Sequence, residues 1–272
     1  MDEKKEKQNL SLLVVVVIMG MIIACAILYV KNPTPAPNSN VDTNIATSTN
    51  KTDSNTVQPN LGMHLKGDID AEILVTEYSD IECPFCARFN EVMSQIMTDY
   101  GSSGKVAWQY KHFPLEQIHP TARSKAEATE CAAELGGNDI FWKYLDVLIK
   151  TQDIVGSAKF VDLDLELFQT CIQNNVFAPI IEEHIKEGTS FNIEGAPYSV
   201  VTIKNGSTFI IPGAYPYGVV KLAIDMTLAG KNEKIIQELI DMIGRGEEQE
   251  KIEEFLTENY PEALSETEQP SE

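Results

Sequence analysis

The 272-residue sequence is poor in basic residues, with 21 Lys and Arg against 41 Asp and Glu and a formal net charge of −20 at pH 7. Proteins that bind nucleic acid meet the phosphate backbone with clustered Lys and Arg, so this composition excludes nucleic acid as a partner. Ten of the acids are Glu residues after Gly246. About half of the acidic excess therefore lies in residues 246–272, which we expect to form an acidic C-terminal helix and tail.

Cysteine and histidine are also scarce, with five and four residues. Five cysteines are too few for a miniprotein built on disulfides. A zinc site needs about four ligands and usually repeats its Cys pair, yet Cys83-Pro84-Phe85-Cys86 is the only C-x-x-C segment, and the histidines offer no close-set pair on one face. The sequence therefore predicts no bound metal, and it contains no pattern that indicates a cofactor.

Long apolar runs are absent except at residues 10–30, which carry no charge. At about 1.5 Å per residue a helix of this length spans roughly 30 Å, the thickness of a bilayer core. A secretory signal has a shorter core and a small-residue cleavage site, which this run lacks. Lysines precede the run, so residues 1–9 should stay in the cytoplasm. We expect residues 10–30 to anchor the chain in the cell membrane, with everything beyond them outside the cytoplasm.

Two other interpretations of the N-terminus remain. Residues 22–25 resemble a bacterial lipobox, which would be cut before Cys25 and lipidated there, and the run could also direct simple secretion. In a membrane helix Cys25 is only a small apolar residue. All three interpretations export the same domain. Residues 31–61 are rich in Asn, Thr, Ser and Pro and cannot bury enough surface to fold, so we expect a flexible tether.

The rest of the chain has an α/β pattern. Apolar spacing predicts strands at residues 73–78, 106–111, 200–204 and 209–211, and helices at residues 89–100, 119–135, 140–150, 165–173, 178–187, 217–228, 233–243 and 250–256. The order is β-α-β, a block of helices, then β-β-α. We expect one domain over residues 62–245, with a helical insertion at about residues 114–190.

The C-x-x-C segment has three possible uses: half a zinc site, a structural disulfide or a redox pair. Cys83 follows a predicted strand and precedes a predicted helix, where free N–H groups and the helix dipole favour the thiolate. Pro84 suits the first turn of that helix, and Cys86 should be more buried, as a resolving thiol is. So short a disulfide loop would add little stability. These features favour the redox pair.

The residues around the pair resemble those of a known family. The segments are EYSDIECPFCARF (77–89), YKHFPLEQIHPTARSKAEATECA (110–132), FWKY (141–144) and EGAPY (194–198). They resemble the DsbA-like thiol:disulfide oxidoreductases, extracytoplasmic enzymes with a thioredoxin fold and an inserted helical subdomain. The resemblance covers about residues 66–230 and implies that Cys83 and Cys86 are catalytic.

The resemblance also implies that Pro197 is a cis-proline facing the Cys pair, which is an uncommon peptide geometry. It would bring the backbone of Ala196 beside the sulfurs, where an extended substrate can pair with it. Pro84 and Phe85 would then contact substrate as well. The alternative is an ordinary trans-proline at the start of the next strand.

The resemblance implies a role for an acidic residue near the pair, and the neighbouring strand carries a basic residue that could be its partner. Glu77 corresponds to a buried acid that assists proton transfer near the resolving Cys, and Lys111 on the neighbouring strand is a candidate partner for it. Alternatively, Glu77 is solvated on an outer face. Asp80 and Glu82 are expected to be loop residues.

Cys131 and Cys171 each lie on a predicted helix of the inserted block. Some members of the family link this block with a second disulfide. If these two residues pair, the closed loop of about 40 residues would contribute roughly 3–4 kcal/mol in the chain-entropy model. The alternative is two buried thiols that pack as small apolar side chains.

Together these features predict a membrane-tethered enzyme that introduces disulfides into reduced exported proteins. The family implies a membrane quinone-linked protein as reoxidant. Phe85 replaces the His that the family's best-known oxidant carries between its Pro and second Cys, so we expect a milder oxidant. Two alternatives stay open: a disulfide isomerase or reductase of the same fold, and a non-catalytic tethered module that binds peptides.

Overall fold

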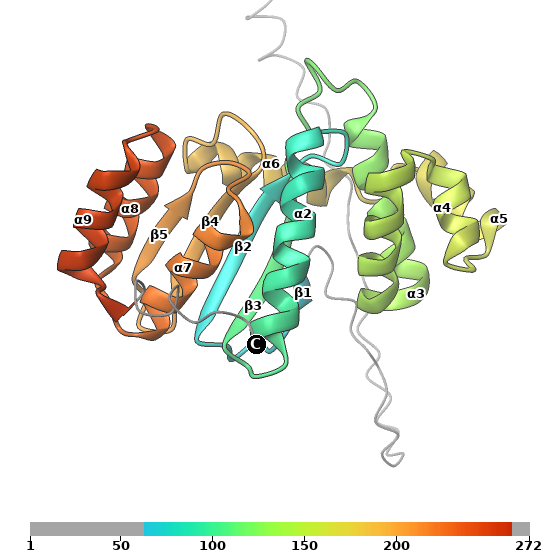
Figure 1. Ribbon diagram of the computed structural model, residues 1–272. Coiled ribbons are helices and arrows are strands. Elements are labelled where there is room, and N and C mark those ends of the chain that lie inside the picture. The colour runs from blue at the N-terminus through green and yellow to red at the C-terminus, as the bar shows by residue number, and fades with distance from the viewer. Residues whose placement is uncertain (1–62, 263–272) are drawn as a thin grey trace, which may run out of the picture. The chain divides into compact units, whose positions relative to one another are not determined.

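The computed structural model describes residues 63–262 (Figure 1). The predicted tail, anchor and tether, with Cys25, lie outside the described residues and stay predictions. None of the helices between residues 63 and 262 combines the length and the apolar character that crossing a bilayer requires.

A five-stranded sheet with the order β1-β3-β2-β4-β5 forms the centre of the domain. Its strands are β1 (His64–Lys66), β2 (Ile73–Ser79), β3 (Val106–His112), β4 (Tyr198–Ile203) and β5 (Thr208–Ile211). β2 and β3 are parallel and the other pairs are antiparallel. A parallel pair needs a crossover, which α2 (Pro84–Ile96) and the π-helical turn η1 (Met97–Gly101) provide. β2 is buried along most of its length, which explains its run of Ile, Leu and Val.

Helices cover both faces of the sheet. Figure 1 shows α2 and α7 (Tyr217–Leu228) in front of it and α6 (Ala178–Ser190) behind it. α8 (Glu233–Gly244) packs against β5, and α9 (Gln249–Asn259) packs against α8. Leu256 of α9 belongs to the main buried core. The expected boundary at residue 245 therefore does not separate α9 from the core of the domain.

The helices between β3 and α6 lie to one side of the sheet (Figure 1). They are α3 (Ala122–Thr151), α4 (Ile154–Phe160) and α5 (Leu165–Gln173). α3 consists of two helical parts, as the helices expected at residues 119–135 and 140–150 predict, and they meet at a kink at Gly137. The φ of Gly137 is 77°, which glycine adopts without a Cβ clash. The sequence did not predict β1 or α4. A three-residue strand shows no alternation, and α4 is short, although Asp153 caps it by accepting from the Gly156 N–H.

A disulfide joins Cys131 of α3 to Cys171 of α5, with their Cα atoms 5.9 Å apart. This is the pairing that the family resemblance implies. It links two helices across 40 residues of sequence.

Candidate active site

Cys83 lies at the N-terminal end of α2, with an extended backbone (φ −73°, ψ 121°) and Pro84 in the first turn. Pro84 lacks the N–H group that this position leaves unpaired, so it suits the start of the helix. The Ala87 N–H donates to the Cys83 carbonyl at 3.0 Å and closes the turn. The sulfur thus lies at the positive end of a helix.

The pKa of the Cys83 thiol is lowered to about 6. The largest cause is a hydrogen bond from the Cys86 thiol, and the backbone N–H groups of Cys86 and Phe85 act in the same direction. Burial and the negative charge of Asp80 oppose them. Cys83 is therefore mostly thiolate at neutral pH, which makes it a nucleophile and a good leaving group.

Cys86 lies one turn into α2 and has the opposite character. It is 1% exposed, and this burial, together with the hydrogen bond to Cys83, raises its pKa well above the usual range. The Asp80 N–H donates to its sulfur at 3.3 Å. Both thiols are free in this structure. The pair thus combines one sulfur that ionises readily with one that holds its proton.

The loop before β4 lies beside this pair. The Ala196–Pro197 peptide bond is cis, the geometry that the resemblance implies. The Cys83 thiol faces the carbonyl oxygen of Ala196, with 3.5 Å between sulfur and oxygen. The backbone of Ala196 is therefore adjacent to the reactive sulfur.

Glu77 is fully buried in β2 and is not on a solvated face. The Trp108 Nε1–H donates to its carboxylate at 2.9 Å. Burial raises the pKa of Glu77 to about 7, although hydrogen bonds from Ser79 and Trp108 oppose the shift. The Ser79 hydroxyl also lies within hydrogen-bonding reach of the Cys86 sulfur. One oxygen of the Glu77 carboxylate accepts from Trp108, and the other is buried without a hydrogen-bond partner in the described part of the chain.

We expect Glu77→Gln to change how stability depends on pH. The pKa of Glu77 in the folded state, about 7, lies above its ordinary value of 4.5, so the folded state favours the protonated form. The stability that the protonated Glu77 adds is present in full below about pH 4.5. As pH rises through 7 this stability is lost, which lowers the free energy of unfolding by about 3 kcal/mol. Urea unfolding should show that the variant loses less stability than wild type between pH 5 and pH 8.

Glu91→Gln, which removes an exposed carboxylate from α2, is the matched control for the Glu77 variant. Equal pH dependence in wild type and Glu77→Gln would show that Glu77 does not hold its proton more tightly in the folded state.

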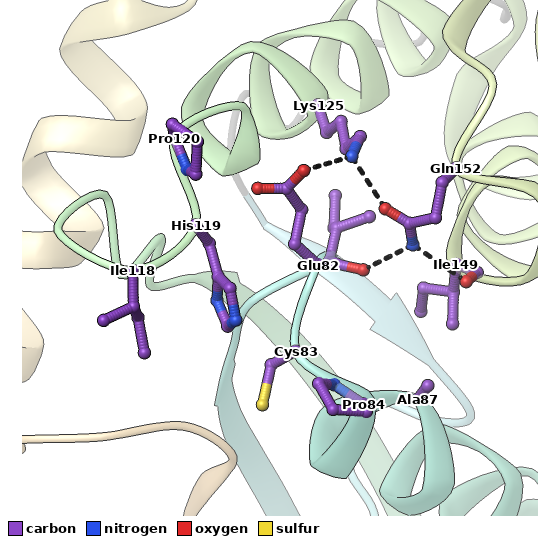
Figure 2. A pocket seen from close by; sticks show the side chains of 11 residues that line it. Glu82, Cys83, Pro84, Ala87, Ile118, His119, Pro120, Lys125, Ile149 and Gln152 are labelled. Carbon is purple, nitrogen blue, oxygen red and sulfur yellow. Dashed lines mark hydrogen bonds and ion pairs between the residues drawn. The ribbon is translucent and has the colours of Figure 1, made fainter.

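A pocket of about 530 Å³ opens beside Cys83, between the N-terminal end of α2 and the subdomain helix α3 (Figure 2). The polar side chains that line this pocket bond to one another. The Lys125 ammonium forms an ion pair with Glu82 and donates to the Gln152 side-chain oxygen at 2.7 Å. Gln152 in turn donates to the backbone oxygen of Ile81 at 2.9 Å. Glu82 is a loop residue, as expected, and it also connects the redox loop to α3.

Asp80 lies in the same loop, but its carboxylate is fully buried. Backbone N–H groups of Glu82 and Leu115 donate to its two oxygens, both at 2.7 Å. The side chain of His119 bonds to it at 2.9 Å. His119 lines the pocket together with Cys83. The sequence did not single out this pair, because 39 residues separate its two members.

A family model described as thioredoxin matches residues 60–208, which is more than half of the chain. The chain belongs to the thioredoxin family. Its structure resembles DsbA2 of Pseudomonas aeruginosa, with a TM-score of 0.52, 26% identity, and coverage of 61% of this chain and 94% of that one. It also resembles oxidised BdbD of Bacillus subtilis, with a TM-score of 0.54, 22% identity, and coverage of 62% and 94%. The predicted DsbA-like character and thioredoxin-like α/β fold are confirmed.

Curated proteins also match part of this thioredoxin-family chain. It is 32% identical over 140 residues to the Na(+)/H(+) antiporter NhaA 3 of Salinispora tropica, which covers 49% of the chain and 21% of the antiporter. A second antiporter, NhaA 1 of Salinispora arenicola, is 30% identical over 173 residues, or 61% of the chain and 25% of that protein. The chain thus spans about a fifth to a quarter of the length of these curated relatives.

The expected partnership of Lys111 with Glu77 in this DsbA-like domain is wrong. The Lys111 ammonium pairs with Glu187 of α6. In the parallel register Glu77 lies opposite Tyr110, not Lys111. Successive side chains of a strand point to opposite faces of the sheet, so Lys111 points away from the face that carries the acid.

Two histidines that are distant in the sequence meet at one buried acid. Glu130 of α3 accepts hydrogen bonds from His64 of β1 at 2.9 Å and from His112 of β3 at 3.0 Å, and all three side chains are buried. Burial would raise the pKa of Glu130, but these bonds hold it well below its usual range. These hydrogen bonds therefore link β1, an edge strand of the sheet, to α3. Between residues 63 and 262 no group of three His, Cys, Asp or Glu side chains is arranged to hold a metal ion.

Phe85 of this thioredoxin-family domain is 54% exposed beside the redox pair. The Arg88 guanidinium lies 4.5 Å from the centre of its ring, a cation–π contact. A cation is therefore present next to Phe85, although Phe85 itself supplies no charge. Phe85 and Arg88 are three residues apart on one helix, and this spacing could have predicted the contact from the sequence.

Proposed function

We propose that the protein is a membrane-tethered thiol:disulfide oxidoreductase that forms disulfide bonds in exported proteins. The observation that supports this most is the Cys83 thiol at the start of α2, with its pKa lowered to about 6. A sulfur that is stable as a thiolate leaves readily from a mixed disulfide, which favours transfer of the disulfide to a client. The likeness to DsbA2 supports the same activity.

The residues take the following roles in this proposal. A client thiolate attacks Cys83 of the Cys83–Cys86 disulfide, and Cys86 leaves as a thiolate. Because burial raises the pKa of Cys86, it takes up a proton, and Glu77 is the buried acid that supplies it. The second client thiol then attacks the client sulfur of the mixed disulfide, and Cys83 leaves. Client backbone pairs with Ala196 beside Pro197, and Pro84 and Phe85 line the approach.

The location and partners belong to the same proposal. Residues 10–30 anchor the chain in the cell membrane, residues 31–61 act as a tether, and the catalytic domain lies outside the cytoplasm. Reduced exported proteins are the clients, and a membrane quinone-linked protein reoxidises the cysteine pair.

The reduction potential of the Cys83–Cys86 pair tests the direction of exchange. We expect a value above roughly −200 mV, whereas a value near −270 mV, which is typical of reducing thioredoxins, would favour a reductase. A Cys86→Ala variant should accumulate mixed disulfides with exported proteins through Cys83, and a Cys83→Ala/Cys86→Ala variant should not. If Cys86→Ala forms no mixed disulfide, the non-catalytic peptide-binding module is favoured.

A further inference from the structure

His119 and Asp80 form a hydrogen-bonded pair beside the redox sulfur. Asp80 belongs to the connection between β2 and α2, and His119 to the connection between β3 and α3. Their bond joins the His119 Nδ1 atom and an Asp80 carboxylate oxygen at 2.9 Å. The Asp80 side chain is fully buried, whereas the His119 side chain keeps 19% of its surface exposed.

The surroundings of Asp80 determine which nitrogen of His119 carries the proton. Two backbone N–H groups already donate to its oxygens, so both oxygens act as acceptors. The imidazole nitrogen that bonds to one of them is therefore the donor, and the neutral imidazole carries its proton on Nδ1. Its Nε2 atom is then an acceptor, and no residue between 63 and 262 donates to that atom. The Asp of a Ser-His-Asp triad orients its His by the same logic.

The free nitrogen belongs to a side chain that borders the reaction site. His119 and Cys83 line the same pocket, and Figure 2 shows the imidazole ring extending toward the side of the pocket where Cys83 lies. A client thiol that reaches Cys83 through this pocket therefore lies next to the imidazole of His119. A free thiol has a pKa near 8.5, so at neutral pH it must lose a proton before it attacks.

We propose that His119 is the general base that takes the proton from the incoming client thiol, and that Asp80 positions it. This inference rests on the proposed oxidase function. The client S–H proton passes to His119 Nε2 as the client sulfur bonds to Cys83. The Cys83–Cys86 bond breaks, and its electron pair stays on Cys86. After His119 releases its proton to solvent, it takes the proton of the second client thiol, whose sulfur bonds to the first client sulfur. The bond between that sulfur and Cys83 breaks, and its electron pair stays on Cys83. The client thus loses two electrons and the cysteine pair gains them.

The charged groups around His119 are compatible with this role. Lys125 is neutralised by Glu82, and Arg123 at the start of α3 pairs with exposed carboxylates. The titratable and charged groups that line the pocket with His119 are Glu82, Cys83 and Lys125, and Asp80 bonds to the imidazole from behind the pocket wall. Asp80 is the one that bonds directly to the imidazole.

The test compares wild type with His119→Gln in the oxidised full-length chain, across pH 6 to 10. The probe is a synthetic peptide with two cysteines of ordinary pKa. General-base catalysis contributes about 10²–10⁴-fold at most, and less for a thiol that is already partly ionised. We expect His119→Gln to be slower by about ten- to a hundredfold at pH 6.5, with the difference vanishing by about pH 9.5, where the peptide thiol ionises unaided.

Two further variants make the test decisive. Added imidazole should restore much of the rate of His119→Ala at pH 6.5. Ile118→Ala, which changes the same pocket without removing a base, should alter the rate by a factor that does not depend on pH. A pH-independent defect in His119→Gln, or no response of His119→Ala to imidazole, would overturn the assignment. A wild type that fails to oxidise the peptide at any pH would instead refute the proposed function itself.

Discussion

Cys83→Ser should reduce disulfide exchange with a reduced client peptide by at least about 10³-fold, because the hydroxyl that replaces the sulfur cannot form the mixed disulfide. The loss should be present at every pH, unlike the defect of a proton-transfer variant. Serine is nearly isosteric with cysteine, so the start of α2 and the Ala87–Cys83 backbone bond should be kept. Stopped-flow measurement of peptide oxidation, with circular dichroism to verify folding, is the appropriate assay.

The matched control for Cys83→Ser is the Cys131→Ala/Cys171→Ala variant, which removes two sulfur atoms from the same domain. We expect it to retain exchange at a temperature at which it is folded. Exchange by Cys83→Ser at more than about a tenth of the wild-type rate would show that another group is the nucleophile.

Removal of the Cys131–Cys171 disulfide should have the largest effect on stability. The bond closes a loop of 40 residues, and for a loop of this length the chain-entropy model gives about 4 kcal/mol at 25 °C. The bond also holds α5 against α3, where Cys131 is buried and Cys171 is partly exposed. We therefore expect Cys131→Ala/Cys171→Ala to lower the free energy of unfolding by about 3–4 kcal/mol.

Urea denaturation of the full-length chain measures this change, with Cys83 and Cys86 kept reduced in both proteins. The single variant Cys171→Ala should behave like the double variant, because either change opens the loop. A decrease of less than about 1 kcal/mol would mean that the loop is held closed by packing alone and that the disulfide adds little.

The fold was predictable where the local sequence decides the structure. The helices at residues 165–173 and 217–228 have the predicted bounds, because their apolar spacing and end residues are local signals. β1 and α4 were missed, since their three and seven residues form only where the rest of the domain supports them. The break between the two helical parts of α3 was predictable as well, because the glycine pair at 136–137 marks it and Gly137 has a non-helical backbone.

The candidate site was predictable around the C-x-x-C segment and less so beyond it. Cys83 and Pro84 follow local rules for a helix start. By contrast, the bonds of Asp80 to His119 and of Glu130 to His64 and His112 join distant segments, and a single sequence contains no periodic signal for such contacts. The error at Lys111 had another cause: the alternation of side chains on β3 already assigned it to the face opposite Tyr110.

The pH dependence of Cys83 alkylation tests the central claim most directly. Reaction of the reduced full-length chain with iodoacetamide, followed by mass spectrometry of the peptide that contains Cys83, gives the pKa of this single thiol. We predict that the rate rises with a midpoint near pH 6, the value to which the Cys86 thiol and the start of α2 lower the pKa. A midpoint near 8.5, the value of free cysteine, would contradict the account.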